Sequence, residues 1–251
     1  MEPHRNPPTA LVLDFDGVIC DSVEECFVSS WTAYHILFRK EPAAEAPPAA
    51  RHAFSRLRPF IRTGEDFVVI QDIIARGDAV SDQKGFDAAA RRASADTRRL
   101  FRDLFYQART TLLERDRQAW LGLNRIYPHM AAAFARMPRG APVWILSTKK
   151  PRFVAEVLAA NGISVREGHI LASEDEPKLS AVEGLREREG FPGAILVEDQ
   201  IDAIKGNTNP RIRVFLATWG YVKEEWLEEP AAVPLLKPEG FLELVEAEFA
   251  R

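Results

Sequence analysis

The feature that most constrains the fold is an alternation of apolar and amphipathic segments after residue 140. Short apolar runs occur at 143–147 (VWILS), 169–172 (HILA), 194–198 (AILVE) and 214–218 (VFLAT). The segments between them have the spacing of amphipathic helices, expected over 151–162, over 178–190 and from Asp199 onward. Apolar strands that alternate with helices are typical of a parallel sheet covered by helices.

A fifth apolar run, at residues 10–14, lies far from the others in the sequence. Residues 21–126, which separate it from them, contain helical periodicity and no convincing strand. The first strand must therefore join the later sheet. We expect an α/β core made of 1–20 and 127–251, with 21–126 inserted as a separate all-helical domain.

The inserted domain has apolar residues at every third or fourth position in three stretches. They include Phe27, Phe67 and Phe105, and this spacing favours packing in a core over an exposed binding surface. The proline-rich stretch 41–50 (EPAAEAPPAA) is expected to be a loop.

Composition excludes some classes of partner. The 251 residues are 46% hydrophobic and carry a formal charge of -4, so nothing indicates a general affinity for nucleic acid or anionic lipid. No segment approaches the roughly 20 uninterrupted apolar residues of a membrane span, and residues 1–10 are polar. We expect a cytoplasmic monomer or homodimer, with Cys20 and Cys26 as reduced thiols.

Charged residues follow the ends of several expected strands. Asp14 and Asp16 end the first run, and Glu198 and Asp199 end the fourth, with Asp202 three residues on. Ligand sites in parallel sheets lie beyond the carboxyl ends of the strands, so these acids are expected to converge. Carboxylates held together repel one another unless a cation binds, and an all-oxygen site indicates Mg2+.

These motifs resemble those of the haloacid dehalogenase superfamily. DFDGVICDS (14–22) is similar to its first motif, ILSTKKP (145–151) to its second, the lysine of EPKLS (176–180) to its third, and LVEDQID (196–202) to its acidic fourth. ATWGYVKEEW (217–226) is similar to a turn of the phosphoglycolate-phosphatase-like branch. The resemblance implies a Rossmann-like parallel sheet of five strands with helices on both faces, and a helical cap between the first two motifs.

The resemblance also implies catalytic roles. Asp14 corresponds to a nucleophile that forms an aspartyl-phosphate, and Asp16 to the general acid and base. Thr148 is expected to hold a phosphoryl oxygen, with Ser147 as the alternative, and Lys178 to offset negative charge. Contacts to the substrate are also expected from Gly17 and Lys149.

Mg2+ is the implied cofactor, held by Asp14 and the backbone carbonyl of Asp16. Asp199 is expected to be a direct ligand and Asp202 a supporting one, but Glu198 with Asp202 has the commoner spacing, so the choice among these three acids stays open.

The cap is expected to determine which substrate binds. RPFIRTGEDF (58–67) is the best candidate for a substrate loop, through Arg62 and Glu65. The alternative for this stretch is an ordinary helix start with Thr63 as the N-cap.

The resemblance predicts a hydrolase, a phosphatase that acts on a small phosphorylated metabolite. Asp16 disfavours dehalogenation, because dehalogenating members generally lack this second aspartate. Phosphonate cleavage is disfavoured because the segment from Asp21 to Phe38 contains no lysine. The remaining alternatives are a phosphomutase with the same intermediate and a non-catalytic binding protein.

Overall fold

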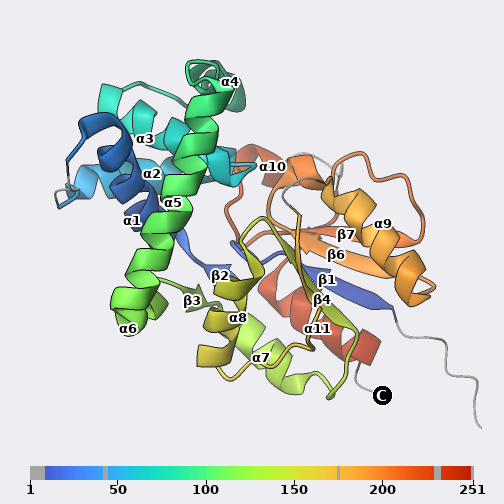
Figure 1. The fold of residues 1–251 in the computed structure, drawn as a ribbon. Coiled ribbons are helices and arrows are strands. Elements are labelled where there is room, and N and C mark those ends of the chain that lie inside the picture. The colour runs from blue at the N-terminus through green and yellow to red at the C-terminus, as the bar shows by residue number, and fades with distance from the viewer. Residues whose placement is uncertain (1–8, 42–44, 174–175, 229–232, 250–251) are drawn as a thin grey trace, which may run out of the picture. The chain divides into compact units, whose positions relative to one another are not determined.

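The computed structural model describes residues 9–41, 45–173, 176–228 and 233–249 (Figure 1). The chain divides into two compact units. One, here called the sheet unit, comprises Met1–Asp21 with Ile126–Arg251, and the other, the helical unit, comprises Ser22–Arg125. The polar first eight residues and part of the expected loop at 41–50 lie outside the described residues.

Within its described residues, the sheet unit is built on six parallel strands in the order β5-β4-β1-β6-β7-β8. The strands are β1 (Ala10–Leu13), β4 (Val143–Ser147), β5 (Ile170–Ala172), β6 (Ala194–Glu198), β7 (Ile212–Ala217) and β8 (Leu235–Leu236). The helices are α7 (Pro128–Arg136), α8 (Pro151–Ala160), α9 (Lys178–Glu189), α10 (Glu224–Glu228) and α11 (Pro238–Phe249). The first strand of the chain therefore lies in the middle of the sheet, between β4 and β6.

Alternate residues of the strands point to opposite faces, and both faces are buried. Val12 and Leu196 belong to a cluster with Val182 and Leu185 of α9, so α9 covers this face (Figure 1). Leu11, which points the other way, is also fully buried. The predicted parallel sheet with helices on both faces is confirmed.

Two predictions made from the sequence of this unit are corrected by the structure. In the part of the chain that the structure describes, the sheet has six strands instead of five, because β8 is too short to leave a readable apolar run. The helix expected from Asp199 is wrong: only the 3-10 turn η4 (Ile201–Ala203) forms there. The Asn207 side chain then donates a hydrogen bond to the carbonyl of Ile212, 2.7 Å away, and the chain turns directly into β7.

A separate two-stranded sheet, β2 (Cys20–Asp21) with β3 (Arg125–Ile126), lies where the chain leaves the sheet unit and returns to it. The helical unit contains α1 (Val23–Tyr34), the π-helix η1 (His35–Arg39), α2 (Pro48–Leu57), the 3-10 turns η2 (Arg58–Phe60) and η3 (Gly64–Asp66), α3 (Phe67–Arg76), α4 (Gln83–Ala90), α5 (Ala95–Arg115) and α6 (Arg117–Gly122). Helix α2 begins inside the stretch that the sequence predicted as loop, because proline is tolerated in the first turn of a helix.

Aromatic side chains form the core of the helical unit. Phe54 lies between Phe27 and Phe67, with ring centroids 5.3 and 5.9 Å away, and Phe67 stacks on Phe105 at 5.0 Å. All four are buried. The regularly spaced aromatics are thus packed as a core, as their periodicity predicted.

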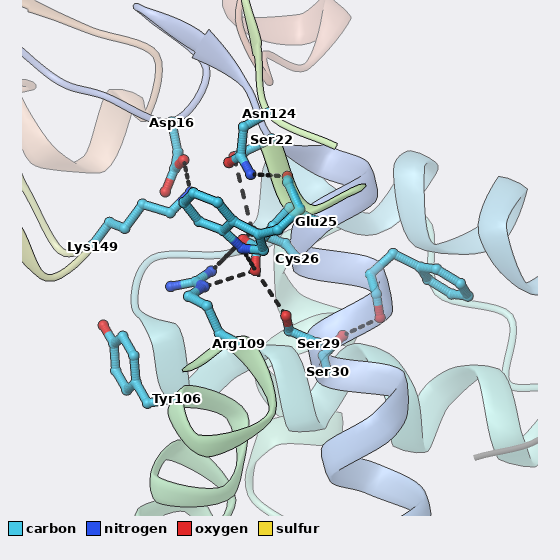
Figure 2. Close-up of polar contacts among 12 residues, drawn as sticks. Asp16, Ser22, Glu25, Cys26, Ser29, Ser30, Tyr106, Arg109, Asn124 and Lys149 are labelled. Atoms are coloured by element: carbon cyan, nitrogen blue, oxygen red, sulfur yellow. Dashed lines mark hydrogen bonds and ion pairs between the residues drawn. The ribbon is translucent and has the colours of Figure 1, made fainter. Parts of the chain in front are cut away.

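A buried ion pair joins α1 to α5 inside the same unit (Figure 2). Arg109 donates from Nε and Nη2 to the two oxygens of Glu25, at 2.8 and 2.7 Å. Ser29 donates to the same carboxylate at 2.7 Å, and Trp120 at 3.4 Å. Both charged side chains are almost completely buried, at 0% and 2% exposure, so each depends on the other for compensation.

Among the helices that the structure describes, none is long and apolar enough to cross a membrane.

Candidate active site

Three neighbouring strands bring the predicted acids and hydroxyls to one edge of the sheet. Strand β1 lies between β4 and β6, and all three run parallel. Asp14 directly follows β1, Ser147 is the last residue of β4, and Glu198 is the last residue of β6. The backbone N–H of Asp14 donates to the carbonyl of Val197 at 3.0 Å, which continues the ladder to the edge.

Asp14 is 7% exposed and lies between a cation and another acid. Its Oδ1 is 2.8 Å from Lys178 Nζ. Burial, reinforced by the negative charge of Glu198, raises the pKa of Asp14 to about 7 although Lys178 acts in the opposite direction. This environment disfavours the ionised carboxylate unless more positive charge is present.

Lys178 is the first residue of α9, and its side chain is 11% exposed. It contacts both Asp14 and the Oε2 of Glu198, the latter at 2.5 Å. Burial opposes the charged form, but the two carboxylates outweigh it and hold the pKa of Lys178 above its ordinary value. A solvated lysine at a helix start is therefore not what the structure contains.

Glu198 is held on both of its oxygens. Oε1 accepts the backbone N–H groups of Asp199 and Gln200, at 3.1 and 3.0 Å, while Oε2 faces Lys178. Burial holds the pKa of Glu198 above its ordinary value, although Lys178 lowers it. These contacts fix the carboxylate beside Lys178 and leave little freedom in its orientation.

Asp199 approaches the backbone closely because two neighbours are glycines. Its Oδ2 accepts the N–H of Tyr221 at 2.8 Å. A Cβ on Gly17, whose φ is +91°, would lie 1.9 Å from that oxygen, and one on Gly220 would lie 2.4 Å from the Cβ of Asp199. Gly17 and Gly220 therefore make room for this acid.

The three acids of the fourth motif lie in two different environments. One carboxylate oxygen each from Asp14, Glu198 and Asp199 lies within 4.8 Å of the other two. Asp202 is outside this group, and its Oδ1 instead pairs with Lys205 at 2.5 Å. The structure thus brings Glu198 and Asp199 to Asp14, whereas Asp202 lies outside this group of three acids and its supporting role stays a prediction.

The three acids fit a small divalent cation. Mg2+ binds oxygens at about 2.1 Å, so ligands on opposite sides of the ion are about 4.2 Å apart, a little less than the 4.8 Å within which the three oxygens lie. Carboxylate oxygens are also the ligand type that Mg2+ prefers.

The second aspartate of the first motif has a lysine partner. Lys149 Nζ lies 2.9 Å from Asp16 Oδ1, and the lysine side chain is 1% exposed (Figure 2). The ammonium also lies 5.3 Å from the centre of the Phe15 ring. The sequence predicts that Lys149 contacts substrate, and it contains no signal for the burial of Lys149 against Asp16.

The two candidates for the second-motif hydroxyl differ in environment. Ser147 is 1% exposed, and its Oγ accepts the backbone N–H of Lys149 at 3.2 Å. Thr148, the next residue, is half-buried.

The predicted substrate loop of the helical unit is tied down within that unit. Arg62 pairs with Asp87 at 2.7 Å, and Glu65 with Arg102 at 3.3 Å. Asp66 accepts the backbone N–H groups of Arg62 and Thr63, at 2.9 and 3.1 Å. These contacts support the alternative of a helix start.

The turn after β7 supports the first motif in a way that the sequence did not predict. Trp219 Nε1 donates to the carbonyl of Val18, and Tyr221 donates from its hydroxyl to Asp21, both at 2.9 Å. The sequence of this turn resembles a turn of the phosphoglycolate-phosphatase-like branch, but no sequence pattern indicates that it contacts residues 18 and 21.

The parallel sheet, with a lysine and a carboxylate cluster at its carboxyl edge, defines the chain as an α/β protein with a candidate hydrolytic site. The chain matches the haloacid dehalogenase-like hydrolases over residues 8–207 and belongs to that family.

Solved structures share this fold at low sequence identity. A predicted phosphoglycolate phosphatase from Haemophilus somnus is 16% identical, with a TM-score of 0.59 over 96% of this chain and 99% of that one. A predicted phosphatase from Clostridium acetobutylicum is 14% identical, with a TM-score of 0.56 over 96% and 99%. A hydrolase from Pseudomonas syringae is 14% identical, with a TM-score of 0.58 over 95% and 98%. The comparison with curated proteins found no match.

Proposed function

We propose that this hydrolase is a Mg2+-dependent phosphatase that forms an aspartyl-phosphate on Asp14. The observation that carries the proposal is the meeting of Asp14, Lys178 and two further acids at the carboxyl edge of the sheet. Two solved proteins with the same fold are described as a predicted phosphatase and a predicted phosphoglycolate phosphatase, which agrees with this chemistry. We also propose that the substrate is a small phosphorylated metabolite and that the protein is cytoplasmic, as the sequence predicts.

In the first step, an Asp14 carboxylate oxygen attacks phosphorus while the bond to the leaving oxygen breaks. Asp16 gives its proton to that oxygen, so the product leaves as an alcohol. In the second step, Asp16 takes a proton from water, the water oxygen bonds to phosphorus, and the bond from phosphorus to Asp14 breaks. Atoms and protons balance, and the enzyme returns to its starting state.

The other residues hold charge in place. Lys178 is already paired with Asp14 and is positioned to offset negative charge on the phosphoryl group. Thr148 is proposed to donate its hydroxyl to a phosphoryl oxygen, since Ser147 is buried and already accepts a backbone hydrogen bond. Asp14, Glu198 and Asp199 would hold Mg2+, which when bound supplies positive charge beside the phosphoryl group.

The proposal is tested by Asp14→Asn, which removes the nucleophile and changes the shape very little. We expect this variant to fold and to lose Mg2+-dependent release of phosphate from p-nitrophenyl phosphate. Asp103→Asn is the matched control, because Asp103 is an exposed aspartate of α5, and it should keep the wild-type rate. Turnover by the Asp14 variant at the wild-type rate would exclude Asp14 as nucleophile.

A further inference from the structure

Two lysines, Lys149 and Lys150, follow β4, and they differ in their exposure to solvent. Lys150 is exposed, whereas Lys149 is 2% exposed. A lysine is seldom buried to this extent without a partner, because removal of its charge from water is costly. The partner is the Asp16 carboxylate, 2.9 Å from the ammonium group (Figure 2).

We propose that Lys149 is a positioning residue, which holds Asp16 in the orientation needed for proton transfer. This inference rests on the proposed function, in which Asp16 is the acid and base. General acid catalysis requires the carboxyl group within hydrogen-bond reach of the leaving oxygen, and small displacements of a catalytic group are costly. The ion pair restrains the Asp16 side chain from the adjacent strand end.

The direction of the lysine side chain distinguishes this role from substrate binding. The ammonium group faces Asp16 and the Phe15 ring, at 2.9 and 5.3 Å. Lys178, not Lys149, faces Asp14, where the phosphoryl group would be bound. Lys149 therefore acts on the leaving group through Asp16 instead of acting on phosphorus.

This division of roles has a kinetic consequence. A basic leaving group needs the proton from Asp16 as its bond to phosphorus breaks, whereas a weakly basic one can leave without it. The ratio kcat/KM reports steps up to the departure of the leaving group, and so excludes the later attack by water. Loss of Lys149 should therefore lower kcat/KM in proportion to the basicity of the leaving group.

The experiment compares p-nitrophenyl phosphate, with a weakly basic leaving group, and phenyl phosphate, with a more basic one. In Lys149→Met, kcat/KM for phenyl phosphate should fall about 10- to 100-fold, a part of the usual contribution of general acid catalysis. The value for p-nitrophenyl phosphate should change less than about threefold on the same argument. Lys149→Arg, which can still donate to Asp16, should recover most of the loss. Lys237→Met, at an exposed lysine of the same unit, should match the wild type on both substrates.

A double-mutant cycle with Asp16→Asn tests whether Lys149 acts through Asp16. If it does, adding Lys149→Met to Asp16→Asn should cause no further loss. An equal loss on both substrates in Lys149→Met, or a further loss in the double variant, would overturn the proposal. Should Lys149→Met fail to fold, Lys149→Gln takes its place with the same expectations.

Failure of this inference is distinct from failure of the proposed function. If Asp14→Asn retains the wild-type rate, the aspartyl-phosphate mechanism is wrong, whatever the leaving-group profile. If Asp14→Asn is inactive and the profile of Lys149→Met is flat, only the positioning role is wrong.

Discussion

The buried Glu25 carboxylate of the helical unit should depend strongly on its pairing with Arg109, and Arg109→Met tests this. The substitution leaves a fully buried carboxylate without its cation, and removes the two hydrogen bonds that Arg109 donates to Glu25, at 2.8 and 2.7 Å. Ser29, Trp120 and the Cys26 thiol, which also donate to Glu25, are neutral and do not replace the lost charge. Breaking a buried ion pair from one side costs about 3–5 kcal/mol, and we expect the free energy of unfolding to fall by that amount.

The assay is thermal unfolding followed by circular dichroism. For a chain of this size, about 2–4 °C is lost per kcal/mol, so Tm should fall by about 6–20 °C. Arg99→Met is the matched control: Arg99 is on the same helix, and its pair with Asp96 is exposed at 61% and 93%. It should change stability by less than about 0.5 kcal/mol.

The double variant Glu25→Gln with Arg109→Met separates charge from packing. It removes both charges, so most of the stability lost in Arg109→Met should return. If the free energy of unfolding falls by less than about 1 kcal/mol in Arg109→Met, the reasoning is refuted. Such a result would mean that the buried Glu25 carboxylate does not need Arg109 to compensate its charge.

Two further predictions concern the sheet edge. In the metal-free protein, the pKa of Asp14 is raised, so the native state binds a proton at Asp14 more tightly than the unfolded state does. This proton binding stabilises the native state at low pH, and the stabilisation is lost as the pH rises from about 3.8 to about 7. Urea unfolding across that range should therefore show a decline in the wild type that is smaller in Asp14→Asn, and equal slopes would contradict the assignment. Gly220→Ala should weaken Mg2+ binding measured by calorimetry at least tenfold, because its Cβ would lie 2.4 Å from the Cβ of Asp199, whereas Gly184→Ala, with open space around the added Cβ, should leave binding unchanged. Equal affinities in these two glycine variants would show that the close approach of Asp199 does not matter.

The sequence predicted the parts of the fold that depend on local pattern. Strands β4 and β6 are apolar except for their last residue, and α8 and α9 are each followed closely by a glycine at positive φ, Gly162 and Gly190. The two-residue β8 is too short for any periodicity to be read. The turn after Asp199 was mistaken for a helix, because its apolar residues are also compatible with one.

The site was predictable in outline for a different reason. The carboxyl ends of parallel strands meet at one edge, so Asp14, Glu198 and Asp199 converge once the topology is known. Pairings between side chains far apart in the sequence leave no local signal. The contact of Lys149 with Asp16 spans 133 positions and that of Arg109 with Glu25 spans 84, so neither could be read from spacing.

The most direct test of the central claim is to trap the phosphorylated enzyme. Asp16→Asn should still be phosphorylated by p-nitrophenyl phosphate, whose leaving group needs little help, but should react slowly with water because the base is missing. After an acid quench, peptide mass spectrometry should find one phosphoryl group on Asp14, removable by neutral hydroxylamine. A phosphoryl group on another residue, or stoichiometric release of p-nitrophenol with Asp14 unmodified, would contradict the account.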